Sequence, residues 1–213
     1  MTDIHSHILY GLDDGARDAE ESRRMLAAAS GMGVTHIIAT PHVRHADFDL
    51  DRAYRRHEEV QAMAEPFGIR VDLGFELHWN ALVSLEETAA RGFSFQDTDH
   101  ILLEFSLSAP ELPLEHDQAI YRLQRAGLNV IIAHPERYRF VQRRSSTVER
   151  WRDMGCELQL DAICLLRAYE PRSKSTARRL YKAGMYDYLA SDAHCAEDYV
   201  RFDKALKWAQ RHE

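Results

Sequence analysis

Near its start the sequence reads TDIHSHI (residues 2–8), and this stretch decides between two folds. Residues 2–5 are predicted to form a short buried strand, and Ser6, His7 and Ile8 occupy the loop that follows it. A dinucleotide-binding fold needs a glycine-rich turn at this point, because its backbone must approach a pyrophosphate closely. These three positions hold no glycine. The stretch therefore argues against an open dinucleotide-binding sheet and favours a closed β/α barrel.

Strand-like and helix-like segments alternate along the whole chain, which is typical of α/β proteins. The predicted strands are residues 2–5, 35–40, 70–75, 100–104, 129–133, 157–161 and 187–190. The predicted helices lie near residues 19–32, 51–64, 81–91, 115–126, 146–154, 173–183 and 197–211. No linker rich in glycine, serine or proline interrupts the alternation. We therefore predict a single domain over residues 1–213, built as an α/β barrel.

The composition excludes several classes of protein. The 213 residues are 45% apolar and 29% charged, which is ordinary for a globular protein. The net charge of −7 disfavours nucleic acid and anionic membranes as partners. No run approaches 18 apolar residues, and the three cysteines contain no CxxC pair. We therefore expect no transmembrane span, no signal peptide, no disulfide framework and a cytoplasmic location.

Residue types that bind metals gather at the ends of the predicted strands, where a β/α barrel carries its chemistry. Every predicted strand except the sixth (157–161) ends in such residues. The candidate ligands are His5, His7, Asp14, His42, Glu76, Glu104, His134, Asp192 and His194. Residues two apart on a strand point to the same face, so His5 and His7 can reach one ion, and so can Asp192 and His194. Nine ligands exceed the needs of one tetrahedral zinc and predict two or three ions with open positions.

Each candidate ligand also has a purely structural interpretation. A lone HxH pair occurs by chance, a buried Glu104 can form a salt bridge, and His134 can be satisfied by the backbone. The combination favours the metal site. The four carboxylates Asp14, Glu76, Glu104 and Asp192 would repel one another in one pocket without cations, and their pKa values would rise. Divalent ions would remove that cost.

Five motifs in this sequence occur together in one known group of proteins. They are HSH (5–7), DDG (13–15), TPH (40–42), AHPERY (133–138) and SDAH (191–194). With them the chain resembles the PHP (polymerase and histidinol phosphatase) superfamily. Within it, the chain looks most like the manganese-dependent protein-tyrosine phosphatases of bacterial capsule and exopolysaccharide gene clusters. The resemblance implies a distorted (β/α)7 TIM-like barrel and a trinuclear metal centre held by the nine candidate ligands.

The resemblance also implies a cofactor and a partner. The cofactor would be two or three Mn²⁺ ions, with Fe or Zn as alternatives. The partner would be the tyrosine-phosphorylated tail of a bacterial kinase that controls polysaccharide export. Arg137 falls on the arginine of the family's HxER segment. A second phosphate-binding arginine often follows the SDxH segment, and Arg201 is the nearest candidate, at an irregular offset. Relatives usually continue further past this segment, whereas this sequence ends after one predicted helix.

The reaction predicted from this resemblance is metal-assisted hydrolysis of a phosphomonoester. A metal-activated hydroxide would attack phosphorus, and the planar guanidinium of Arg137 would bind two phosphate oxygens. Asp14 and Arg201 complete the candidate catalytic residues. A phenolate leaving group has a conjugate acid with a pKa of about 10, so a general acid is less critical than for an alkyl ester.

The segment from His194 to Arg201 also matches the HCx5R pattern of cysteine-dependent tyrosine phosphatases. In those enzymes a tight loop of small residues holds phosphate around a thiolate. Here Glu197 and Asp198 lie inside the pattern, where they would repel phosphate, and the segment is predicted to begin a helix. We therefore expect Cys195 to take no part in catalysis.

Two other functions remain as alternatives. The chain could be a PHP-type phosphatase of a small ester such as histidinol phosphate, or a catalytically silent metal-binding regulatory module. An amidohydrolase is disfavoured, because those enzymes commonly carry a carbamylated lysine where this sequence has Glu104. A basic cluster contains Arg137, Arg139, Arg143 and Arg144. It is either a solvated segment or a surface that steers an anionic phosphopeptide to the site.

Overall fold

The computed structural model describes residues 1–85, 89–167, 169 and 172–212. All of its strand pairs are parallel, and they form two sheets of order β1-β2-β4 and β3-β5-β6-β7-β8-β9. The strands are β1 Thr2–Ser6, β2 His36–Ala39, β3 His42–Val43, β4 Arg70–Leu73, β5 Glu76–His78, β6 His100–Glu104, β7 Asn129–Ala133, β8 Glu157–Asp161 and β9 Tyr188–Ala190. The predicted α/β class with parallel strands is therefore confirmed.

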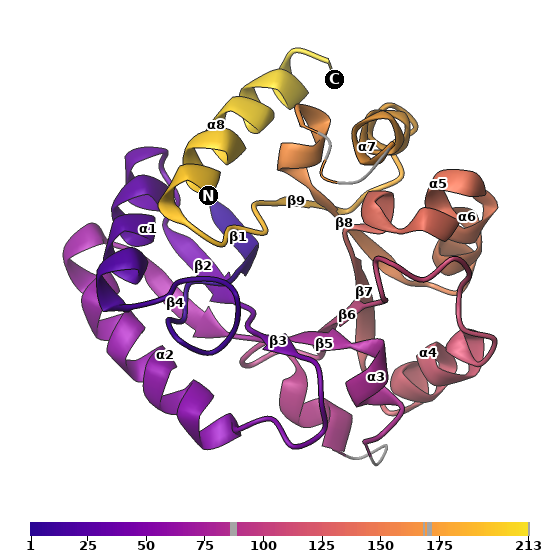
Figure 1. Cartoon of the computed structure of the whole chain (residues 1–213), viewed down its shortest axis with the longest axis horizontal. Coiled ribbons are helices and arrows are strands. Elements are labelled where there is room, and N and C mark those ends of the chain that lie inside the picture. Colours follow the sequence, from indigo (N-terminus) through magenta and orange to yellow (C-terminus); the bar gives the residue numbers. More distant parts are fainter. Residues whose placement is uncertain (86–88, 168, 170–171, 213) are drawn as a thin grey trace.

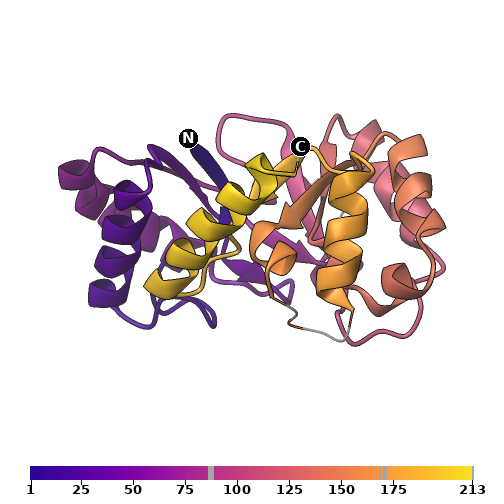
Figure 2. The ribbon, with the colours of Figure 1, turned by 90° about the horizontal axis from the view of Figure 1, so that it is seen from above.

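Helices lie around the outside of the two sheets (Figure 1). The α-helices are α1 Ala19–Gly31, α2 Leu50–Ala64, α3 Trp79–Leu82, α4 His116–Arg125, α5 Arg139–Arg143, α6 Ser146–Asp153, α7 Ser173–Lys182 and α8 Ala196–Gln210. Short 3₁₀ helices are η1 Glu65–Phe67, η2 Ala89–Phe93, η3 Pro135–Arg137 and η4 Ala162–Leu165. The last helix, α8, packs against α1 and η4 (Figure 2). The described helices are too short or too polar to span a bilayer.

The second and third predicted strands correspond to β2 and β4, and each is followed by a further short strand that was not predicted. β2 and β4 pair in the first sheet, whereas their continuations β3 and β5 pair in the second. The divisions fall at Thr40-Pro41 and at Gly74-Phe75. A Cβ atom on Gly74 would lie 2.4 Å from Phe95 and 2.9 Å from Ile38, so only glycine allows this close approach. The strands β3 and β5 were therefore missed, because two or three residues are too few to give a periodic pattern.

The predicted helix over residues 81–91 is wrong. The structure has α3 and η2 there instead, and residues 86–88 lie outside the described part of the chain. In a continuing helix the Ser84 N–H would donate to the Asn80 carbonyl. Instead Ser84 N donates to Ala81 O at 3.0 Å, and the Ser84 hydroxyl donates to Asn80 O at 3.0 Å. The Ser84 hydroxyl thus takes the place of the Ser84 N–H at the Asn80 carbonyl, and the helix ends there.

Hydrogen bonds join β1 to the segment that follows β9, although these segments lie at opposite ends of the chain. Ser6 and Ala193 form an isolated parallel bridge. His7 N donates to Ala193 O, and Asp192 N donates to His5 O, each at 2.9 Å. Below them the buried Asp3 carboxylate accepts from the backbone N–H and hydroxyl of Ser191 at 2.9 and 2.6 Å. This junction places the HSH and SDAH motifs side by side.

Candidate metal centre

Four ligand atoms from three separate parts of the chain converge at the strand ends. His5 lies in β1 and His7 directly follows it, Glu76 begins β5, and Asp192 follows β9. His5 Nε2 lies 3.2 Å from His7 Nε2. Both nitrogens lie 3.2–3.3 Å from Glu76 Oε2 and from Asp192 Oδ1. All four residues are buried.

The other ring nitrogen of each imidazole is already hydrogen-bonded. His5 Nδ1 lies 2.9 Å from Gln159 Oε1, and His7 Nδ1 lies 2.8 Å from Asp13 Oδ2. Because both partners are acceptors, each neutral imidazole carries its proton on Nδ1 and presents the Nε2 lone pair to the group. Four acceptor atoms then face one another. Their separations match the edges of a coordination tetrahedron with bonds of about 2.0 Å, so the group fits a divalent cation.

Glu76 Oε2 also belongs to a second group of ligand atoms. His42 Nδ1 lies 2.8 Å from it and 3.6 Å from Glu104 Oε2. Both Glu76 Oε2 and His42 Nδ1 are buried, and among the described residues neither has a hydrogen-bond partner. Buried polar atoms are rarely left without partners. Three imidazoles approach this carboxylate oxygen without hydrogen bonding to it. Such an oxygen is suited to act as a ligand that bridges two cations.

His134 approaches the same carboxylate from the opposite oxygen. Its Nε2 lies 2.8 Å from Glu76 Oε1 and 3.9 Å from Glu104 Oε1. The backbone φ angles of His134 and Asp192 are +28° and +47°, a region that residues other than glycine seldom adopt. Such strain persists where surrounding contacts enforce it, and it is frequent at functional sites.

A third group lies nearer the surface. The His194 ring stacks on His7 with centroids 4.1 Å apart, and its Nδ1 donates to the Asp192 carbonyl at 2.8 Å. Asp14 Oδ1 lies 3.5 Å from His42 Nε2 and 3.8 Å from His194 Nε2. The Asp14 side chain is 58% exposed, which places it at the mouth of the site.

The structure thus brings all nine sequence-predicted ligands into one connected cluster. Seven of them belong to three overlapping groups whose ligand atoms lie within 4.8 Å of one another. Asp14 and His134 join the cluster through the distances given above. The cluster combines ligands from the N-terminal and C-terminal parts of the sequence, as the strand-end pattern predicts.

The carboxylates of this cluster differ in their pKa values. Burial and repulsion from Glu76 and Asp192 raise the pKa of Glu104 well above its usual range. Burial favours the neutral forms of Glu76 and Asp192. The charge of nearby imidazoles outweighs this effect, so both pKa values lie well below the usual range. The pKa of Asp14 is lowered in the same way. The expectation that all four pKa values rise is therefore wrong for Asp14, Glu76 and Asp192, because the charge of nearby imidazoles outweighs burial there.

The two candidate phosphate-binding arginines occupy different surroundings. Arg137 lies in η3, is mostly buried, and donates from NH1 to Asp192 Oδ2 at 2.8 Å. Arg201 lies in α8, is 42% exposed, and donates to Asp198 Oδ1 at 2.6 Å. Among the described residues the ion-pair partner of Arg201 is Asp198 rather than a candidate ligand. The structure therefore brings Arg137, but not Arg201, into contact with the cluster.

Cys195 precedes α8, and residues 196–201 are all helical. They form no tight loop around the thiol. Burial and the charge of Asp198 raise the pKa of the Cys195 thiol to about 11. A reactive thiolate needs the opposite environment, in which positive charge lowers this pKa.

Three residues that support the cluster were not assigned by sequence reasoning. Asp13 accepts hydrogen bonds from His7 Nδ1, from Gly15 N and from His42 N, at 2.8–2.9 Å. A Cβ atom on Gly15 would lie 2.2 Å from the His7 carbonyl oxygen, so a side chain there would displace a candidate ligand. Gln159 lies in β8, the predicted strand that ends without a ligand. The DDG motif signals Asp13 and Gly15, whereas nothing in the sequence singles out Gln159.

A second buried group of titratable side chains lies beside the cluster. Glu136, Asp161 and Cys164 offer ligand atoms within 4.8 Å of one another. Glu136 Oε1 accepts from the Asp161 N–H at 2.9 Å. Burial raises the pKa of Asp161 to about 7 and that of Glu136 well above its usual range. These groups are suited to the neutral form and are not among the nine candidate ligands.

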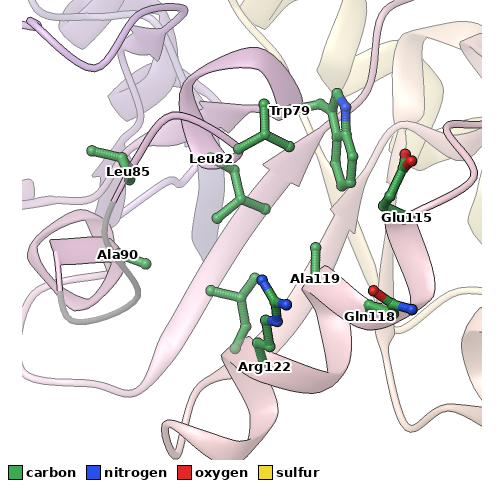
Figure 3. A pocket seen from close by; sticks show the side chains of 10 residues that line it. Trp79, Leu82, Leu85, Ala90, Glu115, Gln118, Ala119 and Arg122 are labelled. Atoms are coloured by element: carbon green, nitrogen blue, oxygen red, sulfur yellow. The ribbon is translucent and has the colours of Figure 1, made fainter.

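A separate hollow of about 290 Å³ lies between α3 and α4 (Figure 3). Trp79, Leu82 and Ala119 give it a largely apolar wall, with Glu115 and Arg122 at its edge. It contains none of the nine candidate ligands.

The model of the family described as "Capsular polysaccharide synthesis, CpsB/CapC" matches residues 1–212. The chain belongs to the CpsB/CapC family. Its relatives include the tyrosine-protein phosphatase YwqE of Bacillus subtilis, 32% identical over 91% of this chain and 77% of the relative. Another is the putative tyrosine-protein phosphatase CapC of Staphylococcus aureus, 28% identical over 91% of this chain and 77% of the relative. The resemblance to the tyrosine phosphatases of capsule gene clusters is therefore confirmed.

Solved structures agree with this assignment to the CpsB/CapC family. A structure from work on YwqE of B. subtilis and CpsB of Streptococcus pneumoniae, described as metal-dependent tyrosine phosphatases, matches with a TM-score of 0.87. It is 28% identical and covers all of this chain and 87% of that chain. A putative histidinol phosphatase of Listeria monocytogenes matches with a TM-score of 0.57 at 12% identity, over 93% of this chain and 97% of that chain. The second match shows a shared fold alone.

Proposed function

We propose that this CpsB/CapC member is a metal-dependent protein-tyrosine phosphatase that acts in capsule or exopolysaccharide synthesis. One observation carries the proposal: four buried acceptor atoms of His5, His7, Glu76 and Asp192 face one another at 3.2–3.3 Å. Such a group is stable only when cations or protons separate its members. The metal-dependent tyrosine phosphatases among the relatives supply the reaction class.

The proposed cofactor is Mn²⁺, in two or three ions, because mixed nitrogen and oxygen ligands suit this ion. The proposed ligands are the nine residues of the cluster: His5, His7, Asp14, His42, Glu76, Glu104, His134, Asp192 and His194. When bound, such ions lower the pKa of coordinated water towards neutrality and balance the charge of a phosphoryl group. Asp13 and Gln159 hold the His7 and His5 rings with Nε2 directed into the group.

Arg137 is proposed to bind the phosphoryl oxygens of the substrate. Its guanidinium already lies against Asp192, and its planar fork fits two oxygens of a phosphate. Asp14 lies at the mouth of the site. It is proposed to be both a cation ligand and a catalytic residue that contacts the entering substrate. Arg201 has a weaker case, since it pairs with Asp198.

We propose that the two parallel sheets make one distorted (β/α)7 barrel within a single domain over residues 1–213, and the Ser6–Ala193 bridge supports this. The proposed partner is a tyrosine-phosphorylated kinase that regulates polysaccharide export. The proposed location is the cytoplasm, where such a kinase would present its phosphorylated tail.

The proposed function is tested by a phosphatase assay on a tyrosine-phosphorylated peptide, with and without chelator. We expect chelation and His42→Ala each to reduce kcat/KM at least 100-fold, because both remove cation binding. Cys195→Ser is the matched control and should retain most of the activity. Loss of activity in Cys195→Ser with resistance to chelation would establish the thiolate mechanism instead. Faster turnover of histidinol phosphate than of the peptide would overturn the substrate assignment.

A further inference from the structure

An arginine-lined hollow lies beside the segment that carries Arg137. Arg139, Gln142 and Arg143 of α5 and Arg172, which precedes α7, line a space of about 250 Å³. The three arginines are exposed, and no carboxylate of the described residues forms an ion pair with any of them. Elsewhere in this acidic chain, Arg44, for example, pairs with an acidic residue. A concentration of unpaired positive charge in a concave surface attracts anions.

The hollow lies next to the η3 turn that carries Arg137. Gln142 Nε2 donates to the carbonyls of Glu136 and Arg137 at 3.0 and 3.3 Å, which fixes one wall of the hollow to the η3 turn. On the other side the Arg137 guanidinium lies 5.2 Å from the centre of the Tyr169 ring. The guanidinium of Arg167 lies 5.3 Å from the same ring. Arg137 and Arg167 thus share one aromatic ring, and Arg137 is two residues away in the sequence from Arg139, which lines the hollow.

We propose that Arg139, Arg143 and Arg172 bind a second phosphoryl group of the substrate peptide while a phosphotyrosine occupies the metal centre. This inference rests on the proposed function. A phosphomonoester carries a charge of about −1.5 to −2 and three acceptor oxygens, which guanidinium forks bind in pairs. The hollow therefore selects peptides that are phosphorylated at two neighbouring positions.

The test compares kcat/KM for three peptides of one sequence, in the presence of Mn²⁺. The first carries a single phosphotyrosine, the second carries another phosphotyrosine two to five residues away, and the third carries glutamate at that second position. For the wild-type chain we expect the doubly phosphorylated peptide to be preferred about tenfold over the singly phosphorylated one. In the double variant Arg139→Gln/Arg172→Gln the ratio should fall to about 1. The preference should also weaken as salt is raised from 50 to 300 mM, because the contacts are exposed.

Arg23→Gln is the matched control. Arg23 is an exposed arginine of α1, which lies on the opposite side of the molecule from α5 (Figure 1). This variant should keep the tenfold preference. Thermal unfolding midpoints of the variants, measured beside the assay, separate loss of binding from loss of folding.

The outcomes separate the two proposals. Failure of the wild-type chain to hydrolyse any phosphotyrosine peptide would overturn the proposed function. Hydrolysis of all three peptides at equal efficiency would overturn the second phosphoryl site alone. A glutamate peptide that equals the doubly phosphorylated one would show a general acidic-peptide surface and would also overturn the proposal. A ratio that is unchanged in the double variant would place the preference elsewhere on the molecule.

Discussion

Glu76 is the residue on which the candidate centre depends most. Its Oε2 atom is approached by His5, His7 and His42, and its Oε1 atom by His134. One carboxylate thus connects four imidazoles that come from strands spread over most of the chain. The geometry makes the site cooperative, because displacing any one of these rings changes the surroundings of a shared oxygen.

Asp13 determines how His7 is presented, and its removal should weaken metal binding. In Asp13→Asn one oxygen becomes an amide nitrogen, which cannot accept from the N–H groups that now surround it. We expect the affinity for Mn²⁺ to fall 10- to 100-fold, as measured by isothermal titration. Asp47→Asn, at an exposed position, should leave the affinity unchanged. Equal affinities in both variants would show that Asp13 does not orient the ligand.

Asp72 gives a pH-dependent contribution to stability that is remote from the metal centre. Burial raises its pKa, but hydrogen bonds from Arg70 and His36 outweigh burial and lower the pKa below the usual value. A lowered carboxylate pKa stabilises the fold above the unfolded value of about 3.9, and this stability is lost as the pH falls below it. Asp72→Asn should therefore reduce the free energy of unfolding by about 1–2 kcal/mol at pH 7. The difference from wild type should shrink towards zero at pH 3.

Urea titrations at the two pH values measure this effect. Glu58→Gln on the exposed face of α2 is the control and should change stability little at either pH. A difference for Asp72→Asn that is as large at pH 3 as at pH 7 would contradict the role assigned to the ionised carboxylate.

The sequence predicts the candidate ligands better than the residues that orient them. Ligand types stand out because they end buried strands, as His5 and Glu104 do. Gln159 lies 154 positions from His5 in the sequence, and its role exists only after β1 and β8 have been brought together. A hydrogen bond of this kind leaves no local pattern, so sequence alone could not reveal it.

At the scale of elements, the break between β4 and β5 directs Glu76 into the site. The break needs glycine at position 74, where a Cβ atom would meet Phe95 and Ile38. Gly74→Ala should therefore destabilise the fold by about 1–3 kcal/mol through overpacking. Gly31→Ala is the matched control, because nothing lies within 4 Å of its Cβ position near the end of α1. That variant should be neutral or more stable by about 0.5–1 kcal/mol.

Chemical unfolding of both variants checks this prediction. Equal stabilities would show that Phe95 moves aside without cost. The existence and order of most strands and helices could be predicted, because their hydrophobic periods are strong and their ends carry clear signals. The break between β4 and β5 could not, since the close approach at Gly74 depends on Phe95 and Ile38 from other parts of the chain rather than on the local pattern.

For the whole molecule, the two parallel sheets and their helices hold the ligands in place, and bound cations should in turn stabilise the fold. A ligand that binds only the native state, at a free concentration of 100 times its Kd, adds about 2.7 kcal/mol to the free energy of unfolding. Adding Mn²⁺ at that excess to chelator-treated protein should raise the free energy of unfolding by about this amount. His42→Ala at the same Mn²⁺ concentration should gain less than half of it. No change in the wild-type chain would argue against a cation in the cluster.

The alternation of strands and helices predicts the α/β class, and the strand-end residues predict where chemistry gathers. The division into two sheets could not be predicted from the alternation. It follows from the short pairings of His42–Val43 with Glu76–His78, which are too brief to give a periodic signal.

The junction between Asp3 and Ser191 has a consequence for how the protein is made. Hydrogen bonds there span 188 residues, and His194 joins the cluster only after residues 1–194 have been synthesised. A nascent or prematurely terminated chain therefore lacks one wall of the ligand cluster, however well its first strands have paired. Hydrolytic capacity should therefore appear only once the segment through His194 has been made and has folded onto β1.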